Sequence, residues 1–337
     1  MESIFNIFVH PLTNPIAVAL VLGAVAYVAS RGLPLAAKGL ALVACVGVLA
    51  GGTVIARDYM STTWSWTWMQ FASDPELSVE LSLAPTVLGM VVVFGAGAFG
   101  LLVTVYSYRA MSGEYWEGKF YAYLTWTLVG TCLVGLAGNL LTLLIGWELV
   151  TLMLFLMLNQ GRAGAKAGAA KAYGILGFAD ACLLLAIALL ASLDGGTRNL
   201  SLLRGPIAVG SLGATGYVIY ALILVAALAK AGAIPLHTWI PSCAEKAPAP
   251  ALALLPAALD KLLGIYLLTV LALRMFRPDW TMQVVLMVIG AVTVLAAVLM
   301  AMIQHNLKKL LSLHAVSQVG YMVLGIGTGV WIGVLGG

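Results

Sequence analysis

The chain has 337 residues, of which 62% are hydrophobic and only 9% are charged, with a mean hydropathy of +1.04 and a net charge of +4. A soluble domain carries about 25% charged residues, so this composition excludes a soluble enzyme or binding domain. The basic residues are scattered singly and form no patch for nucleic acid. We therefore expect an all-α polytopic membrane protein.

Apolar stretches long enough to cross a bilayer follow one another along nearly the whole chain. A spanning helix needs about 20 apolar residues. The hydropathy predicts ten to eleven spans, with ten placed near residues 12–30, 39–56, 84–108, 119–137, 139–158, 169–192, 214–245, 249–273, 281–303 and 309–330. Most lysines and arginines lie in loops after the odd-numbered spans. The positive-inside rule then predicts that these loops are cytoplasmic and that the N-terminus lies outside the plasma or inner membrane.

The largest segment expected outside the membrane runs from Arg57 to about Ser82. It contains Trp64, Trp66 and Trp68, which alternate as residues on one face of a strand do. Tryptophan is also enriched at membrane interfaces. Of the two interpretations, we favour interface anchoring.

Two acidic residues lie inside predicted spans. Glu148 is surrounded by leucines in GNLLTLLIGWELV, and Asp180 lies in AYGILGFADACLL. A charge at the centre of a membrane helix costs about 2.5–3.5 kcal/mol, so such residues usually face a bundle interior or a wet cavity and mark an ion path. Glu148 is either a hydrogen-bonded structural acid or the partner of a buried lysine. For Asp180, a structural role and a tuning role are both open.

The span at 214–245 is expected to break near 230–241, where the chain reads KAGAIPLHTWIP. Pro235 removes a backbone donor and disfavours helix in the residue before it. Irregular backbone at membrane depth is tolerated only when it is buried in protein or lines water. Lys230 before the break is either a desolvated proton carrier or a snorkelling lysine. His237 at the break is either a satisfied polar residue or a proton relay.

The next span carries an adjacent acid and base, Asp260 and Lys261. Neighbouring residues on a helix point about 100° apart, so they do not form a facing pair. We expect Lys261 to face the conduit and Asp260 to counter another helix or to bound the site. The four cysteines are far apart and show no metal-ligand spacing, so neither a metal nor a cofactor is expected in this chain.

Four segments carry a resemblance to a known family. They are AGNLLTLLIGWELVTL, KAYGILGFADACLL, AKAGAIPLHTWIPSCAEKAPAPALALLPAALDKLLGIYLL and NLKKLLSLHAVSQVGYMVLGIG. Together they resemble the antiporter-like membrane subunits shared by respiratory complex I, Mrp-type cation/proton antiporters and group 4 membrane-bound hydrogenases. The resemblance covers about residues 119–330.

The resemblance implies a fold of two inverted repeats of five helices. It predicts N-terminal helices at 1–118, a complete first repeat at 119–275 with the broken helix, and a partial second repeat at 276–337. The remaining helices of that repeat are expected from another membrane subunit of the same complex.

The resemblance also implies a function, namely translocation of H⁺ or Na⁺ within a redox-driven pump or an Mrp-type antiporter. Glu148 and Lys230 would form the switch, and His237 and Lys261 the onward proton path. The acids Asp180 and Asp260 would tune it. Redox chemistry would belong to partner subunits that carry clusters. Two alternatives remain, a structural half-antiporter subunit without its own conduction and a stand-alone solute transporter.

Overall fold

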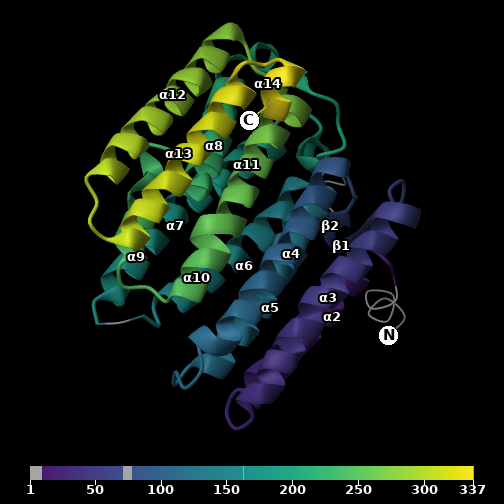
Figure 1. Cartoon of the computed structure of the whole chain (residues 1–337). Coiled ribbons are helices and arrows are strands. Elements are labelled where there is room, and N and C mark those ends of the chain that lie inside the picture. Colours follow the sequence, from purple (N-terminus) through teal and green to yellow (C-terminus); the bar gives the residue numbers. More distant parts are fainter. Residues whose placement is uncertain (1–9, 71–77, 162, 337) are drawn as a thin grey trace. The chain divides into compact units, whose positions relative to one another are not determined.

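The computed structural model describes residues 10–70, 78–161 and 163–336, and most of them are helical (Figure 1). The chain forms two compact units. Unit 1 consists of Met1–Gln160 and Pro248–Leu259, and unit 2 consists of Gly161–Ala247 and Asp260–Gly337. The repeat organisation with boundaries at 118/119 and 275/276 stays a prediction.

Unit 1 is built around one buried helix. Its elements are α2 (Asn14–Ala29), α3 (Pro34–Asp58), α4 (Val87–Ala110), α5 (Glu117–Gly135), α6 (Leu140–Leu158), α10 (Ala249–Leu254) and the π-helical turn η4 (Leu255–Leu259). Helix α5 contacts α2, α3, α4 and α6. Thr125, Thr127 and Thr131 of α5 are buried, and each donates a hydrogen bond to the carbonyl four residues earlier. Polar side chains are therefore accommodated at the centre of this unit without unpaired hydroxyls.

An antiparallel hairpin of β1 (Trp64–Gln70) and β2 (Ser78–Leu83) lies between α3 and α4 in the sequence. The segment with alternating tryptophans therefore forms a strand, and the interface anchoring of these tryptophans stays a prediction. Aromatic and threonine residues in alternation suit a pleated strand. The start of α6 supplies further pairing: Asn139 donates to the Glu80 carbonyl at 2.8 Å, and Thr142 accepts from the Ser82 amide at 2.9 Å.

Unit 2 contains the broken helix. Its elements are α7 (Ala165–Ala191), η1 (Gly196–Leu200), β3 (Ile207–Ala208), η2 (Val209–Leu212), α8 (Gly213–Ala231), η3 (Leu236–Thr238), α9 (Trp239–Ala244), α11 (Asp260–Val270), the π-helical turn η5 (Leu271–Met275), β4 (Phe276–Arg277), α12 (Trp280–Met302), α13 (Leu307–Gly327) and α14 (Trp331–Gly336). Helix α8 contacts α7 and α11, α9 contacts α7 and α13, and α12 lies along α13 (Figure 1). The break in the 214–245 span is thereby flanked by helices on several sides.

Eight helices among the described residues are long and apolar enough to cross a membrane. The ten predicted spans coincide with helices whose ends lie within a few residues of the predicted bounds. The two beyond the eight are α2, a shorter apolar helix, and the buried helix α5. The prediction of an all-α polytopic membrane protein is confirmed.

Candidate functional site

The predicted break lies at the end of α8, and glycine ends the helix three residues before the proline. Gly232 adopts φ +81°, a conformation that favours glycine. The amides of Gly232 and Ala233 both donate to the carbonyl of Leu228 at 2.9 Å. Helical structure resumes at Leu236 in η3. Pro235 therefore follows the helix end, and Gly232 determines it.

Other protein groups form hydrogen bonds with backbone N–H and C=O groups that lose their helical partners at the break. The amide of Ile234 donates to Thr293 Oγ1 on α12 at 3.1 Å. The indole Nε1 of Trp239 donates to the carbonyl of Ala229 at 3.1 Å. Lys261 Nζ donates to the carbonyl of Ala231, the last residue of α8, at 3.3 Å. Irregular backbone at membrane depth is tolerated when it is satisfied in this way.

A buried ion pair lies directly before the break. Lys230 Nζ is 3.9 Å from Asp260 Oδ1, and both side chains are fully buried. Gly264 allows this approach, because a Cβ at that position would lie 2.3 Å from the Ala231 amide nitrogen and 2.7 Å from the Ala227 carbonyl. The backbones of α8 and α11 are thus in direct contact beside the pair.

We call Asp180, Lys230, Asp260 and Lys261 the charged cluster. Asp180, buried on α7, interacts electrostatically with Asp260, as do Lys230 and Lys261. Neither carboxylate oxygen of Asp260 has a hydrogen-bond partner in the described part of the chain. Burial without hydrogen bonds is costly for a polar group, so an acid kept in this state calls for a functional explanation.

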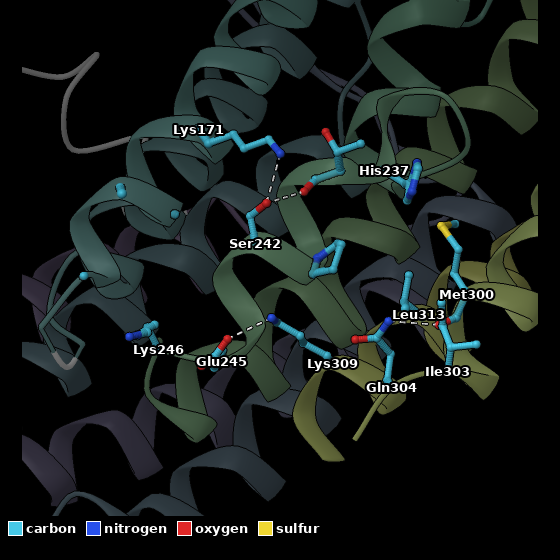
Figure 2. A pocket seen from close by; sticks show the side chains of 15 residues that line it. Lys171, His237, Ser242, Glu245, Lys246, Met300, Ile303, Gln304, Lys309 and Leu313 are labelled. Atoms are coloured by element: carbon cyan, nitrogen blue, oxygen red, sulfur yellow. Dashed lines mark hydrogen bonds and ion pairs between the residues drawn. The ribbon is translucent and has the colours of Figure 1, made fainter. Parts of the chain in front are cut away.

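His237 lies at the break and borders an open cavity of about 780 Å³ in unit 2 (Figure 2). Its side chain is 8% exposed, and Nδ1 has no hydrogen-bond partner among residues that the structure describes. Lys171 of α7 borders the same cavity and donates to Ser242 Oγ at 3.0 Å, and this hydroxyl donates to the Thr238 carbonyl at 2.7 Å. The histidine thus lies between the broken backbone and a space large enough for water or a small ligand.

Glu148 lies on α6 of unit 1, where its side chain is exposed. Its predicted pairing with Lys230 of unit 2 stays a prediction. Within unit 2 the structure pairs Lys230 with Asp260, the acid that was expected to counter another helix or to bound and tune the site.

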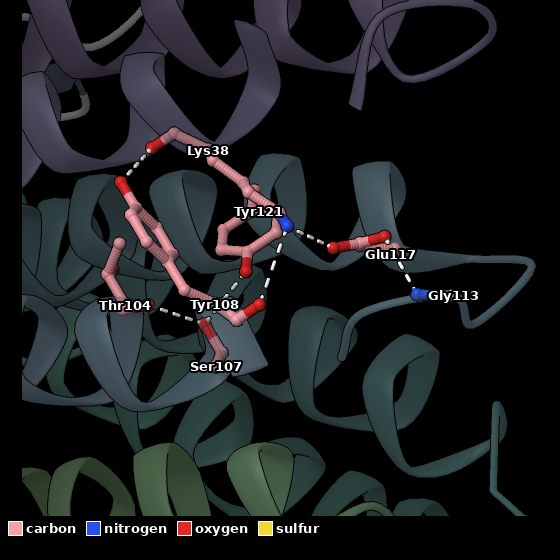
Figure 3. A network of polar contacts seen from close by, with 7 residues as sticks. All are labelled: Lys38, Thr104, Ser107, Tyr108, Gly113, Glu117 and Tyr121. Atoms are coloured by element: carbon pink, nitrogen blue, oxygen red, sulfur yellow. Dashed lines mark hydrogen bonds and ion pairs between the residues drawn. The ribbon is translucent and has the colours of Figure 1, made fainter. Parts of the chain in front are cut away.

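A second polar network lies in unit 1 (Figure 3), and the sequence analysis did not single it out. Lys38 in the first turn of α3 forms an ion pair with Glu117 in the first turn of α5. Tyr108 of α4 donates to the Lys38 carbonyl at 3.1 Å. Ser107 donates to the hydroxyl of Tyr121 at 3.2 Å. The network joins three helices, and we assign it a structural role.

Metal or cofactor ligation receives no support from the described residues, where no three His, Cys, Asp or Glu side chains come together as a metal site. The expectation that this chain carries no cofactor stays a prediction.

Comparison with known proteins identifies the family. Residues 137–335 match the model of the NADH:quinone oxidoreductase/Mrp antiporter transmembrane family. The chain belongs to this family. The match covers α6 to α14 and therefore includes all six residues predicted for the site.

Individual relatives agree with this assignment. The chain is 29% identical over 271 residues to NADH-quinone oxidoreductase subunit L of Escherichia coli. The aligned region covers 79% of this chain and 43% of that protein. It is also 29% identical over 301 residues to NADH-quinone oxidoreductase subunit N of Desulforudis audaxviator. That aligned region covers 87% of this chain and 58% of that protein. A chain of the Mrp complex of Dietzia sp. DQ12-45-1b is similar in structure, with a TM-score of 0.82 and 27% identity over 96% of this chain and 34% of that one. The chain spans about half the length of these curated relatives.

Proposed function

We propose that the chain is an ion-translocating membrane subunit of a multisubunit complex and moves H⁺ or Na⁺. Its relatives are subunits of NADH-quinone oxidoreductase and of an Mrp complex. The observation that carries the proposal is the buried Asp260 carboxylate, which has no hydrogen bond in the described structure and lies 3.9 Å from the ammonium of Lys230. A charge pair held at this depth beside a broken helix is typical of an ion site in a transporter.

In the proposed mechanism, Lys230 holds a proton while a carboxylate is close and releases it when the carboxylate moves away. At 3.9 Å and an effective dielectric near 20, the attraction is worth about 4 kcal/mol. Separating the pair would remove this electrostatic stabilisation of the protonated amine.

The acceptors after Lys230 are proposed to be water, His237 and Lys261. His237 lies at the break, and neutral imidazole both accepts and donates a proton. The ammonium of Lys261 lies against the carbonyl end of α8, where the helix dipole favours a positive charge. Asp180 would adjust the field at Asp260. Glu148 is proposed as a second carboxylate that competes with Asp260 for Lys230.

The surroundings of the subunit are part of the same proposal. We infer a plasma or inner membrane location with the N-terminus outside, because most basic residues occur in loops after odd-numbered spans. Other membrane subunits, and in a redox-driven complex the subunits that carry clusters, would be its partners.

The experiment is ion pumping by the assembled complex in proteoliposomes. Lys230→Ala and Glu148→Ala should each abolish pumping while the complex still assembles. Lys166→Gln is the matched control, since Lys166 is exposed on α7 and belongs to neither the charged cluster nor the cavity lining. Full pumping by either alanine variant would contradict the mechanism. Unchanged pumping after replacement of both Lys230 and Lys261 would favour a purely structural subunit.

A further inference from the structure

The cavity beside His237 lies at one end of the helices of unit 2. Its lining comes from the first turns of α7 and α13, from α9 and the residues that follow it, and from the last turn of α12. This is the end at which the chain enters α7 and α13 and leaves α9 and α12. In the predicted topology these loops follow odd-numbered spans, so the cavity lies at the cytoplasmic face.

The cavity carries a surplus of positive charge. Lys171, Lys246 and Lys309 line it, together with a single carboxylate, Glu245. That carboxylate pairs with Lys309 at 2.8 Å. The other two lysines are exposed and form no ion pair within 4 Å in the described ranges, although the charge of Lys246 also acts on Glu245. Two ammonium groups therefore remain to attract an anion.

A buried polar side chain, that of His237, also lines this space, and it interacts with the backbone of Pro235 at the break. His237 is 8% exposed, and its Nδ1 is without a hydrogen-bond partner in the part of the chain that the structure describes. A buried polar group in this state is normally paired with protein, water or a ligand. A phosphate oxygen would pair with the Nδ1–H form of the imidazole.

Apolar side chains lie on the side of the cavity away from Lys246. Met300, Ile303 and Leu313 gather there together with the amide side chain of Gln304 (Figure 2). Ile303 is 72% exposed, and its neighbour Met302 is 77% exposed. An occupant must therefore present an anionic group to the lysines and a hydrocarbon group to the end of α12.

We propose that this cavity binds the phosphate headgroup of an anionic phospholipid, with an acyl chain lying along the end of α12. Lysines near a membrane surface attract anionic lipids, and the cytoplasmic leaflet is the negatively charged one. A volume of about 780 Å³ lies within the usual range for small-ligand sites. A free phosphate ion would use the cationic wall and leave the apolar side chains without a contact.

The test is native mass spectrometry of the delipidated full-length chain with added phosphatidylglycerol or phosphatidylcholine. Phosphatidylglycerol should be retained in preference to phosphatidylcholine. Lys171→Gln and Lys246→Gln should each reduce its retention about fivefold, which is the contribution of one lysine near an anionic membrane surface. Lys166→Gln, the same change on an exposed lysine of α7 outside the cavity, should leave retention unchanged.

Further measurements keep the test independent of folding. Each variant should elute as a single species and unfold at the temperature of the unmodified chain, and Lys171→Arg should retain the lipid. Equal retention of the two lipids, or equal loss in Lys166→Gln, would overturn the proposal. Displacement of the lipid by excess inorganic phosphate would show a simple anion site and would also overturn it. Since these readouts do not involve pumping, failure here leaves the proposed translocation unaffected.

Discussion

Asp260→Asn should destabilise the chain strongly, because it removes the charge that compensates the buried ammonium of Lys230. The side chain keeps its size, so the perturbation is electrostatic. At the observed 3.9 Å, the lost attraction is about 4 kcal/mol. Breaking one partner of a buried pair typically costs about 3–5 kcal/mol, so the two magnitudes agree. The measurement is the free energy of unfolding of the full-length chain in mixed micelles titrated with dodecyl sulfate.

A double variant separates the pair from other effects of the substitution. Replacing both partners of a buried ion pair is often close to neutral. Asp260→Asn combined with Lys230→Met should therefore be more stable than Asp260→Asn alone, by at least about 1 kcal/mol. If the changes in unfolding free energy of the two single variants sum to that of the double variant within about 0.5 kcal/mol, the residues are not coupled and the reasoning is refuted.

Three other variants test the packing, the pH dependence and the network of unit 1. Gly264→Ala should cost about 1–3 kcal/mol, because the new Cβ meets the backbone of α8, whereas Gly177→Ala, with open space around it, should be neutral or stabilising in the same unfolding assay. The hydrogen bond from Lys309 and its charge hold the pKa of Glu245 below its ordinary value. The ion pair therefore stabilises the chain at pH values above the ordinary pKa of a glutamate. This stabilisation is lost as the pH falls through the lowered pKa of Glu245. Glu245→Gln should lower the Tm at neutral pH and leave it unchanged in strong acid. Glu117→Gln should cost about 2 kcal/mol by removing the charge that the lysine of α3 contacts, and an unchanged unfolding free energy would remove this pair from the stabilising contacts.

Hydropathy was sufficient to predict the helices, since a span of about 20 apolar residues leaves little choice of structure in a bilayer. The break near 230–241 was predicted at the right place, but the residue that ends the helix was not. Pro235 was expected to break the helix, yet the left-handed Gly232 ends it first. The strand at Trp64–Gln70 was one of two interpretations of the tryptophan alternation, and interface anchoring, which is compatible with a strand, stays a prediction.

Four of the six residues predicted for the site lie together in unit 2, but the sequence did not specify that Asp260 would pair with Lys230; the pairing of Glu148 with Lys230 stays a prediction. Asp180, Lys230, Asp260 and Lys261 were selected because charges inside spans are rare, and the structure brings these four together in unit 2. The contact between Lys230 and Asp260 depends on the close approach that Gly264 allows. That approach is a property of tertiary packing, and a single sequence contains no direct signal for it.

The hydrogen bond from Lys261 to the end of α8 connects the protonation of this lysine with the order of a helix end. The donor is the ammonium group of Lys261, and the acceptor is the last carbonyl of α8. A neutral amine donates a weaker hydrogen bond and no longer offsets the negative end of the helix. We therefore expect loss of a proton from Lys261 to loosen the final turn of α8, which also carries Lys230. The length of an ordered helix thus becomes a readout of the protonation state, measurable as hydrogen exchange at the amides of that turn.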